Sequence, residues 1–276
     1  MNAIGIMQGR LSPPLGGRIQ SFPVQSWREE FEKGAIVGID CIEWIYELNA
    51  SSLNPISSSE GIREMLALSG KSGVSVRSLC ADYLLDQPLL RVGNTDLLRS
   101  SQTVVWLLGQ CHLAGINRFV VPFVGRNAIL SEGEAEWVVE EIGRWLPVAE
   151  KFEVEIHLET SLDPHRFRKL LESIAHPLIK VTYDIGNSLQ FGFCAAEEFD
   201  AYGRQIGSVH VKDSKRRGIT VQLGTGDADF KYCFHRLAEI GYQGNYILQG
   251  ARVPGMDEVS LAREYVDFVS SQMPTG

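Results

Sequence analysis

The chain has 276 residues, 44% of them hydrophobic and 22% charged, and its formal net charge is −8. This is the composition of a globular protein, and the acidic balance argues against a nucleic-acid partner, because neutralising phosphates requires clustered Lys and Arg. No apolar run reaches the roughly 18 residues of a membrane helix. The five cysteines are scattered singly, and the first residues lack a signal-peptide pattern, so we expect a cytoplasmic protein with no membrane partner.

Short β-rich runs alternate along the chain with stretches of helical periodicity. The β-rich runs cover residues 3–9, 38–46, 74–81, 116–124, 153–160, 179–186, 206–213 and 245–250. The clearest helical stretches cover residues 27–37, 97–115, 134–152 and 261–272. Eight strand–helix units within about 250 residues predict an α/β fold, a (β/α)8 barrel. An open doubly wound sheet is the alternative, but no G-x-G-x-x-G follows the first strand. Without a long linker, we expect a single domain over residues 1–276.

The fifth strand shows which side chains face the interior of the barrel. In EVEIHLE, Val154, Ile156 and Leu158 share one face, and His157 and Glu159 lie on the other. Because successive side chains alternate across a strand, the apolar face is expected to meet the helices. Glu159 is then expected at the C-terminal rim of the barrel interior, with His157 one layer below as its support.

The last inward residues of the final four strands carry oxygen or nitrogen donors. They are Glu159, Asp184, His210 and Gln249, each about one strand–helix unit after the previous one. Barrel active sites lie at this rim, so the pattern predicts a divalent-metal site. The donor set suits Mn²⁺ first, with Mg²⁺, Co²⁺ or Zn²⁺ as alternatives. The competing interpretation is that Asp184 and Asp213 cap turns while His210 and Gln249 are satisfied polar residues.

These pieces together resemble the xylose isomerase-like superfamily of TIM barrels, which contains sugar isomerases, sugar epimerases and endonuclease IV-type proteins. The resemblance rests on IGIMQGRLSP, GIDCIEW, HLET, YDIGN, HVKD, LGTGDADF and ILQGAR, in this order along the chain. It implies that Glu159, Asp184 and His210 hold one divalent metal. An endonuclease is disfavoured because such enzymes need more strand-end histidines and a less acidic surface.

Two positions depart from the family pattern. Asn187 stands where many members have a histidine that binds substrate or metal, and Gln249 stands where the family has a glutamate that acts as ligand and acid/base. Glutamine can coordinate a metal through its carbonyl oxygen but cannot take a proton. With Glu159 as the only clear carboxylate at the rim, one-base isomerisation or dehydration is favoured over two-base epimerisation. Glu43 is a second candidate carboxylate, or else an interior anchor.

Several residues near strand ends are expected to contact the substrate. Arg216 and Lys212 follow His210 and could hold an anionic group, or form a solvated basic loop. The glycines of LGTGD (223–227) could present amides to a phosphate, or form a turn in which Asp227 caps the next helix. Cys80 is expected to be a packing residue. The remaining candidates for substrate contact are Gln8, Arg10, Glu43, Asn187 and Arg252.

The sequence thus predicts a metal-dependent sugar or sugar-phosphate isomerase or epimerase. Glu159 is expected to act as ligand and base, removing a proton next to a carbonyl to give a metal-stabilised enediolate. The alternatives are a dehydratase (lyase) acting on a cyclitol or keto-sugar, and a barrel that binds sugar without catalysis because of Gln249. The expected partner is a small carbohydrate, and the resemblance is compatible with a homo-oligomer.

Overall fold

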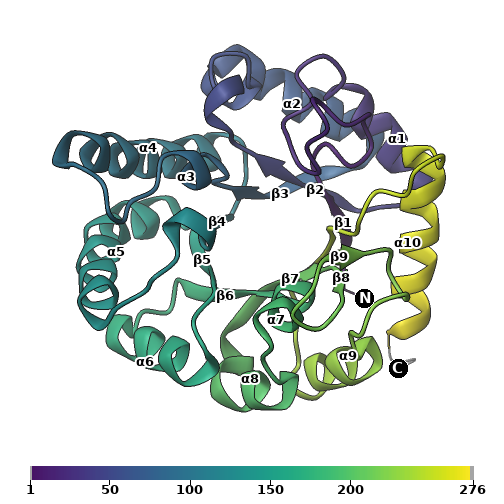
Figure 1. The fold of residues 1–276 in the computed structure, drawn as a ribbon. Helices are drawn as coiled ribbons and strands as arrows, with labels where there is room; N and C mark the ends of the chain where they lie inside the picture. The colour runs from purple at the N-terminus through teal and green to yellow at the C-terminus, as the bar shows by residue number, and fades with distance from the viewer. Residues whose placement is uncertain (1, 274–276) are drawn as a thin grey trace.

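Parallel strands form a closed barrel in the computed structural model, which describes residues 2–273 (Figure 1). Around the barrel the order is β1-β10-β7-β6-β5-β4-β3-β2, so neighbours in sequence are neighbours in space. The fold is therefore a (β/α)8 barrel, as the sequence predicts. The barrel strands are β1 (Ile4–Met7), β2 (Cys41–Ile45), β3 (Ser75–Cys80), β4 (Arg118–Phe123), β5 (Glu155–Thr160), β6 (Ile179–Asp184), β7 (Ile206–Val211) and β10 (Asn245–Leu248).

Helices surround the barrel as an outer ring (Figure 1). The longer ones are α1 (Glu29–Val37), α2 (Ser59–Ser72), α4 (Asn94–Leu113), α5 (Glu132–Phe152), α6 (Pro164–Ile174), α8 (Ala195–Tyr202), α9 (Phe230–Glu239) and α10 (Glu258–Gln272). Shorter elements lie in the loops: α3 (Tyr83–Asp86), α7 (Ile185–Phe191), η1 (Leu48–Ala50), η2 (Pro55–Ser57), η3 (Gly125–Asn127), η4 (Gly203–Gln205), and a hairpin of β8 (Asp213–Ser214) with β9 (Thr220–Val221). Within residues 2–273, no helix combines the length and apolarity needed to span a bilayer.

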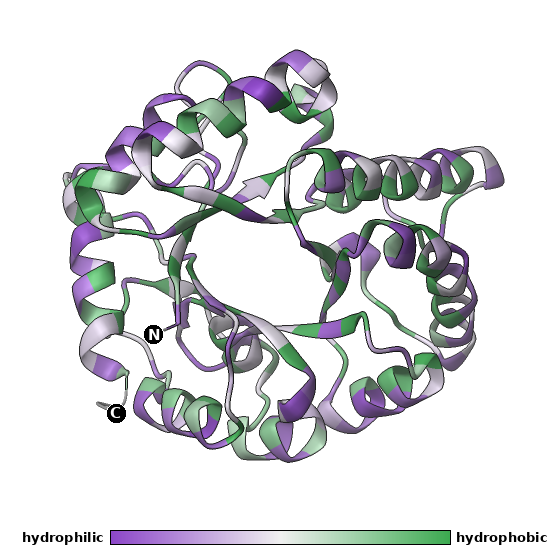
Figure 2. Ribbon diagram, turned by 180° about the vertical axis from the view of Figure 1, so that it is seen from behind, coloured by the Kyte–Doolittle hydropathy of each residue, from purple (hydrophilic) through white to green (hydrophobic). Residues whose placement is uncertain are grey.

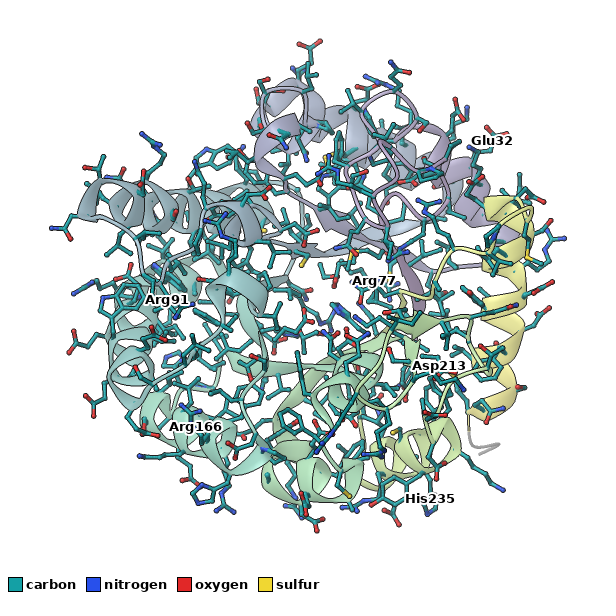
Figure 3. All side chains as sticks on the ribbon, in the orientation of Figure 1. Glu32, Arg77, Arg91, Arg166, Asp213 and His235 are labelled. Atoms are coloured by element: carbon teal, nitrogen blue, oxygen red, sulfur yellow. The ribbon has the colours of Figure 1, made fainter. Side chains whose placement is uncertain are left out.

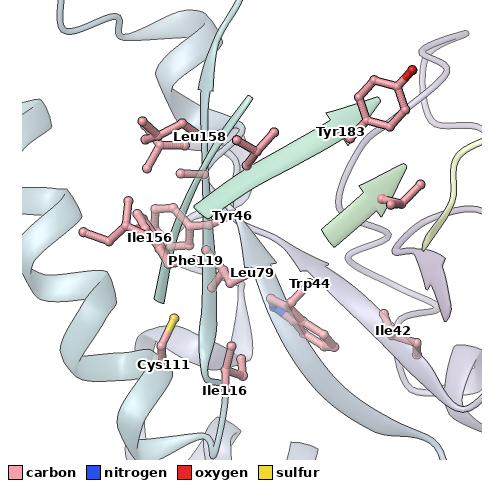
Figure 4. Close-up of a cluster of buried hydrophobic side chains, with 14 of the residues drawn as sticks. Ile42, Trp44, Tyr46, Leu79, Cys111, Ile116, Phe119, Ile156, Leu158 and Tyr183 are labelled. Carbon is pink, nitrogen blue, oxygen red and sulfur yellow. The ribbon is translucent and has the colours of Figure 1, made fainter. Parts of the chain in front are cut away.

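The main hydrophobic core lies between the outer face of the barrel and the helices. Ile156 and Leu158 of β5 are fully buried in it, as strand alternation predicts, together with Trp44 and Phe119 (Figure 4). The outer helices carry both hydrophobic and hydrophilic residues, as expected for helices with one face on the barrel (Figure 2). Burial of this layer is the main favourable contribution to folding.

The interior of the barrel is divided into an apolar and a polar part. The apolar part comes from β1, β2, β3, β4 and β10, and its residues are Met7, Cys41, Ile45, Cys80, Val120 and Ile247. The polar part comes mainly from β5, β6 and β7, where His157, Thr182 and Ser208 are buried and hydrogen-bonded to one another. The inward faces of β5 to β7 therefore carry polar groups up to the rim.

The predicted barrel strands are confirmed, most of them one to three residues shorter than expected. One expectation about a helix start is wrong. Asp229, not Asp227, caps α9, its side chain accepting a hydrogen bond from the backbone N–H of Tyr232. Asp227 instead accepts from the Arg216 backbone and pairs with Lys215 at 3.2 Å. The loop after β7 thus turns back on itself before α9 begins.

A buried glutamate holds the segment that follows β1. Glu30 of α1 is 1% exposed, and its carboxylate accepts hydrogen bonds from the backbone N–H groups of Gly9 and Leu11. Burial raises the pKa of Glu30 to about 7, although the two backbone hydrogen bonds oppose this shift. Its ionised form is therefore less well accommodated in the folded chain than in the unfolded chain.

Replacing Glu30 with glutamine is expected to remove one source of pH dependence from stability. The pKa of Glu30 is higher folded (about 7) than unfolded (about 4.5), so its contribution is fully present below pH 4.5 and lost as pH rises to 7. This lost contribution is roughly 3 kcal/mol. Denaturant titrations of wild type and Glu30→Gln at pH 5 and pH 8 measure it. Glu32→Gln, an exposed change on the same helix, is the control, and equal pH dependence in Glu30→Gln and wild type would contradict the assignment.

Candidate metal centre and the cavity above it

Three buried side chains converge at the C-terminal rim of the barrel. Glu159, Asp184 and His210 come from the ends of β5, β6 and β7, and one ligand atom from each lies within 4.8 Å of the other two. The Nδ1 atom of His210 is 3.9 Å from Glu159 Oε2 and 3.9 Å from Asp184 Oδ2. Neighbouring parallel strands end at the same edge, which is why residues far apart in sequence meet here.

His210 is oriented by a carboxylate from across the barrel. Its Nε2 donates to Glu43 Oε1 at 2.7 Å, and Ser78 donates to the other oxygen of Glu43 at 2.6 Å. His210 and Glu43 are both 0% exposed. Burial lowers the pKa of His210, but the carboxylates of Glu43, Glu159 and Asp184 outweigh it and raise the pKa to about 9. Since Nε2 is bound to Glu43 and Nδ1 faces Glu159 and Asp184, Nδ1 is the ring nitrogen that can bind a ligand once it carries no hydrogen.

Asp184 is held from two sides. Its Oδ1 accepts from the backbone N–H of Asn187 at 2.8 Å, which caps α7, and its Oδ2 lies 2.6 Å from Lys212 Nζ. Gly186 makes room for this lysine, because a Cβ there would lie 2.6 Å from Lys212 Cγ. The conformations of α7 and of the Lys212 side chain therefore depend on each other.

Glu159 is 7% exposed, and its Oε1 accepts a hydrogen bond from Asn187 Nδ2 at 2.6 Å. Burial raises the pKa of Glu159 to about 7, against the opposing effect of His210. A carboxyl group with a pKa near neutrality can accept and release a proton at physiological pH. Asn187 thus occupies the expected place beside the site and fixes one oxygen of Glu159.

Gln249 lies on the same rim, directly after β10. Its Nε2 donates to Gln20 Oε1 at 2.9 Å, and its Oε1 is buried. Among the residues that the structure describes, neither Gln249 Oε1 nor His210 Nδ1 has a hydrogen-bond partner. Buried polar atoms without partners are costly. One imidazole nitrogen, two carboxylates and an amide oxygen form a donor set that fits a divalent cation.

A cavity of about 400 Å³ opens above this cluster. Four of the predicted residues line its wall: Glu159, Asn187, Lys212 and Gln249. Cys80 lines it as well. Burial raises the pKa of the Cys80 thiol well above its ordinary value, so it is not a thiolate nucleophile. The cavity has the size of a small-molecule site.

Five residues expected to contact the substrate lie elsewhere. Glu43 is buried beneath His210, and the Gln8 side chain accepts from the Ile45 backbone. Arg10 and Arg252 donate to backbone carbonyls of the loops after β10 and β1, and exposed Arg216 donates to the Phe193 carbonyl. None of these five residues lines this cavity, and their role in substrate binding stays a prediction. Except for Glu43, they follow the strand ends, where the chain turns and strand alternation no longer applies; Gly9, for example, has a φ of 86°.

His157 does not support Glu159 as expected. Its ring is hydrogen-bonded to Ser208 Oγ at 2.9 Å and to Glu155 Oε2 at 3.1 Å. The residue faces the interior as predicted, but Glu159 lies two positions further along the strand, about 6.6 Å away in rise. Burial lowers the pKa of His157. This histidine therefore ties β5 to β7 below the cavity.

The glycine amides of LGTGD do not form an open anion site. Asp213 is 1% exposed and accepts hydrogen bonds from the backbone N–H groups of Ser214, Gly224, Gly226 and Ala228, at 2.8 to 3.2 Å. Figure 3 shows Asp213 on the side of the barrel covered by α9 and α10. Of the two interpretations of this loop, the phosphate site is wrong, because its backbone N–H groups already donate to a carboxylate of the chain.

The sequence reasoning missed five charged or amide residues that line the cavity: Arg18, Gln20, Glu47, Asp82 and Asp86. Asp82 follows β3 directly, so its position at a strand end was a usable signal. Gln20 lies in the long segment between β1 and α1, where no periodicity indicates its place. Glu47 and Asp82 share the cavity with Glu159. Glu159 is therefore not the only carboxylate at the rim, and the preference for one-base chemistry over two-base epimerisation no longer holds.

Comparison with known proteins gives one family and several relatives. A family model described as xylose isomerase-like TIM barrel matches residues 31–271. L-ribulose-5-phosphate 3-epimerase UlaE from Escherichia coli O8 is 24% identical over 271 residues, covering 92% of this chain and 93% of that protein.

Two solved structures show the same fold. D-psicose 3-epimerase with D-tagatose from Clostridium cellulolyticum H10 superposes with a TM-score of 0.77 at 17% identity, covering 99% of this chain and 100% of that chain. The IOLI protein with a binding zinc atom gives a TM-score of 0.76 at 16% identity, with the same coverage. Both match along essentially the whole chain, which supports the closed-barrel topology.

Changing Glu43 to glutamine is expected to weaken binding of Mn²⁺ by about 10- to 100-fold, because the neutral amide orients His210 less firmly and lowers its basicity. Calorimetric titration of metal-stripped protein with Mn²⁺ measures the effect. Glu141→Gln is the control, since Glu141 is a buried carboxylate (3% exposed) on α5, outside the barrel. Unchanged affinity in Glu43→Gln, with an intact fold, would show that Glu43 does not position His210 for metal.

Proposed function

Because the chain belongs to the family of xylose isomerase-like TIM barrels, we propose that it is a divalent-metal-dependent epimerase or isomerase of a sugar or sugar phosphate. The observation that carries this proposal is the convergence of Glu159, Asp184 and His210 within 4.8 Å at the barrel rim, beneath a cavity. Relatives named as 3-epimerases support the same class of reaction.

Four side chains would hold the metal: Glu159, Asp184, His210 through Nδ1, and Gln249 through Oε1. Within residues 2–273, His210 Nδ1 and Gln249 Oε1 are buried without hydrogen-bond partners, which supports this assignment, as does the zinc atom named for the IOLI protein. Mn²⁺ is the proposed ion, since two carboxylates, an amide oxygen and one imidazole suit it. When bound, such an ion acts as a Lewis acid toward a carbonyl oxygen.

Glu159 is the proposed base. It would remove the proton from the carbon next to the substrate carbonyl, giving an enediolate. Asn187 holds Glu159 Oε1 at 2.6 Å, which orients the carboxylate. Lys212, 2.6 Å from Asp184 and on the cavity wall, holds Asp184 in place.

Epimerisation is favoured within this class. It requires a second proton-transfer group on the opposite face of the carbon, and Gln249 cannot supply it. Asp82 and Glu47 are carboxyl groups in the same cavity, and burial raises the pKa of each, although neighbouring hydrogen bonds oppose the shift. The names of the relatives favour the same reaction.

Metal analysis tests the proposed centre without any substrate. Purified wild-type protein is expected to hold about one divalent ion per chain after dialysis against Mn²⁺, and His210→Ala and Asp184→Ala are expected to lose it. Elemental analysis gives the content, and circular dichroism checks the fold. His176→Ala, a change at a histidine outside the barrel near α6, is the control. Metal retained in both ligand variants would refute the centre.

Glu159→Gln is expected to slow proton abstraction by about 10²- to 10⁴-fold, since glutamine cannot accept the proton. Incorporation of solvent deuterium at the carbon next to the carbonyl, followed by nuclear magnetic resonance with L-ribulose or D-psicose, measures this step. Near-normal exchange in the variant would remove Glu159 from the role of base. Loss of water from the sugar, instead of exchange, would identify a dehydratase.

A further inference from the structure

We propose that the substrate is an uncharged sugar, without a phosphate or carboxylate group. This inference rests on the proposed function and narrows its substrate class. Carboxylates outnumber cations in the cavity wall. The acidic residues are Glu47, Asp82, Asp86 and Glu159, and the basic residues are Arg18 and Lys212. Away from the proposed metal, a wall of this charge repels a phosphate dianion and favours a neutral ligand.

Both basic residues already have acidic partners. Lys212 Nζ lies 2.6 Å from Asp184 Oδ2, and its side chain is only 13% exposed. Arg18 donates to Glu47 Oε1 at 3.2 Å, and Glu47 is itself held because its other oxygen accepts from the Phe22 backbone at 2.7 Å. Within the described cavity wall, each of the two cations is thus already paired with a carboxylate of the chain.

Backbone amides offer no alternative site in the loop after β7, where barrels often bind phosphate. Asp213 accepts the N–H groups of Gly224, Gly226 and Ala228. An added Cβ at Gly226 would lie 1.9 Å from Asp213 Oδ1, which shows how tightly the loop encloses this carboxylate. A phosphate would have to displace a buried charge that is already fully hydrogen-bonded.

Beyond Lys212, the basic residues Lys215 and Arg216 make contacts within the loops. Lys215 pairs with Asp227 at 3.2 Å and donates to the Thr225 carbonyl at 2.7 Å. Arg216 donates to the Phe193 carbonyl. Neither residue lines the cavity. These side chains fasten the loop after β7 and do not reach the place where a substrate would lie.

The same wall is well suited to hydroxyl groups. Gln20 donates to Asp82 Oδ2 at 2.6 Å and accepts from Gln249 Nε2 at 2.9 Å, so amide and carboxyl groups alternate along one side. Asn187 contributes a further amide beside Glu159. Donors and acceptors that alternate in this way match the hydroxyls of a ketose, each of which donates and accepts.

The inference separates this chain from a relative named for a phosphorylated sugar, UlaE, and favours a free ketose such as the D-tagatose named with D-psicose 3-epimerase. It is tested with Mn²⁺-loaded protein by comparing kcat/KM for L-ribulose with L-ribulose 5-phosphate, and for D-psicose with D-psicose 6-phosphate. The free sugar is expected to be favoured by about tenfold or more in at least one pair. A higher kcat/KM for the phosphate ester in either pair would overturn the inference.

The substitution Glu47→Gln is expected to improve the use of a phosphate ester relative to the free sugar. It removes the partner of Arg18, while the glutamine oxygen can still accept from the Phe22 backbone. The ratio of kcat/KM for ester over free sugar is expected to rise about tenfold, because the arginine is released for phosphate. Glu64→Gln, which frees exposed Arg28 outside the cavity, is the matched control and is expected to leave the ratio unchanged. An unchanged ratio in Glu47→Gln would count against the inference.

A binding measurement keeps this inference distinct from the proposed function. In calorimetry, inorganic phosphate is expected to give no saturable heat that depends on Arg18. Saturable binding that is lost in Arg18→Gln would overturn the inference whether or not any sugar is turned over. If neither sugars nor esters exchange deuterium with the metal-loaded protein, the proposed function fails, and the phosphate titration still decides whether the cavity accepts an anion.

Discussion

The hydrogen bond between Glu43 and His210 is the contact on which the site depends. It joins β2 to β7 across the barrel at 2.7 Å, and neither side chain is exposed to solvent. A buried charge pair of this kind adds little net stability, because desolvation offsets its attraction, but removing one partner is costly. Its value lies in orientation: the ring nitrogen next to Glu43 is committed, so the other nitrogen faces Glu159 and Asp184. The orientation of His210 at the rim therefore depends on a contact inside the barrel.

The interior is polar mainly on the side of β5 to β7, and Glu43 of β2 and Ser78 of β3 extend this polar network across the barrel. Apolar residues from β1 to β4 and β10 fill the rest of the barrel, and the surrounding core between strands and helices supplies the hydrophobic stabilisation. The polar side chains of β5 to β7 are mostly satisfied by one another, as in the His157, Ser208 and Thr182 set. At the rim, three buried atoms lack hydrogen-bond partners within residues 2–273: Asp184 Oδ2, His210 Nδ1 and Gln249 Oε1. Polar atoms left unsatisfied where a ligand can satisfy them are typical of a binding site.

The sequence predicts the positions of residues on the barrel strands, but not those of residues beyond the strand ends. Alternation along β5 places Glu159 and His157 inside, and the same rule locates Asp184 and His210, because parallel strands end at one edge. Beyond the strand ends the rule fails. Arg10 and Arg252 bind loop carbonyls, and Asp213 fills the glycine loop that resembled a phosphate site. Gln20 and Arg18 come from an irregular segment whose path is set by tertiary contacts, including Glu30, which no local pattern reveals.

The double role of Gln20 has a consequence for motion. This side chain bridges Gln249 after β10 and Asp82 after β3, and so fastens the segment between β1 and α1 at the mouth of the barrel. The groups that hold the segment are those that a sugar would contact, so a ligand must exchange its own hydrogen bonds for these two. Order in the segment and occupancy of the cavity are therefore coupled.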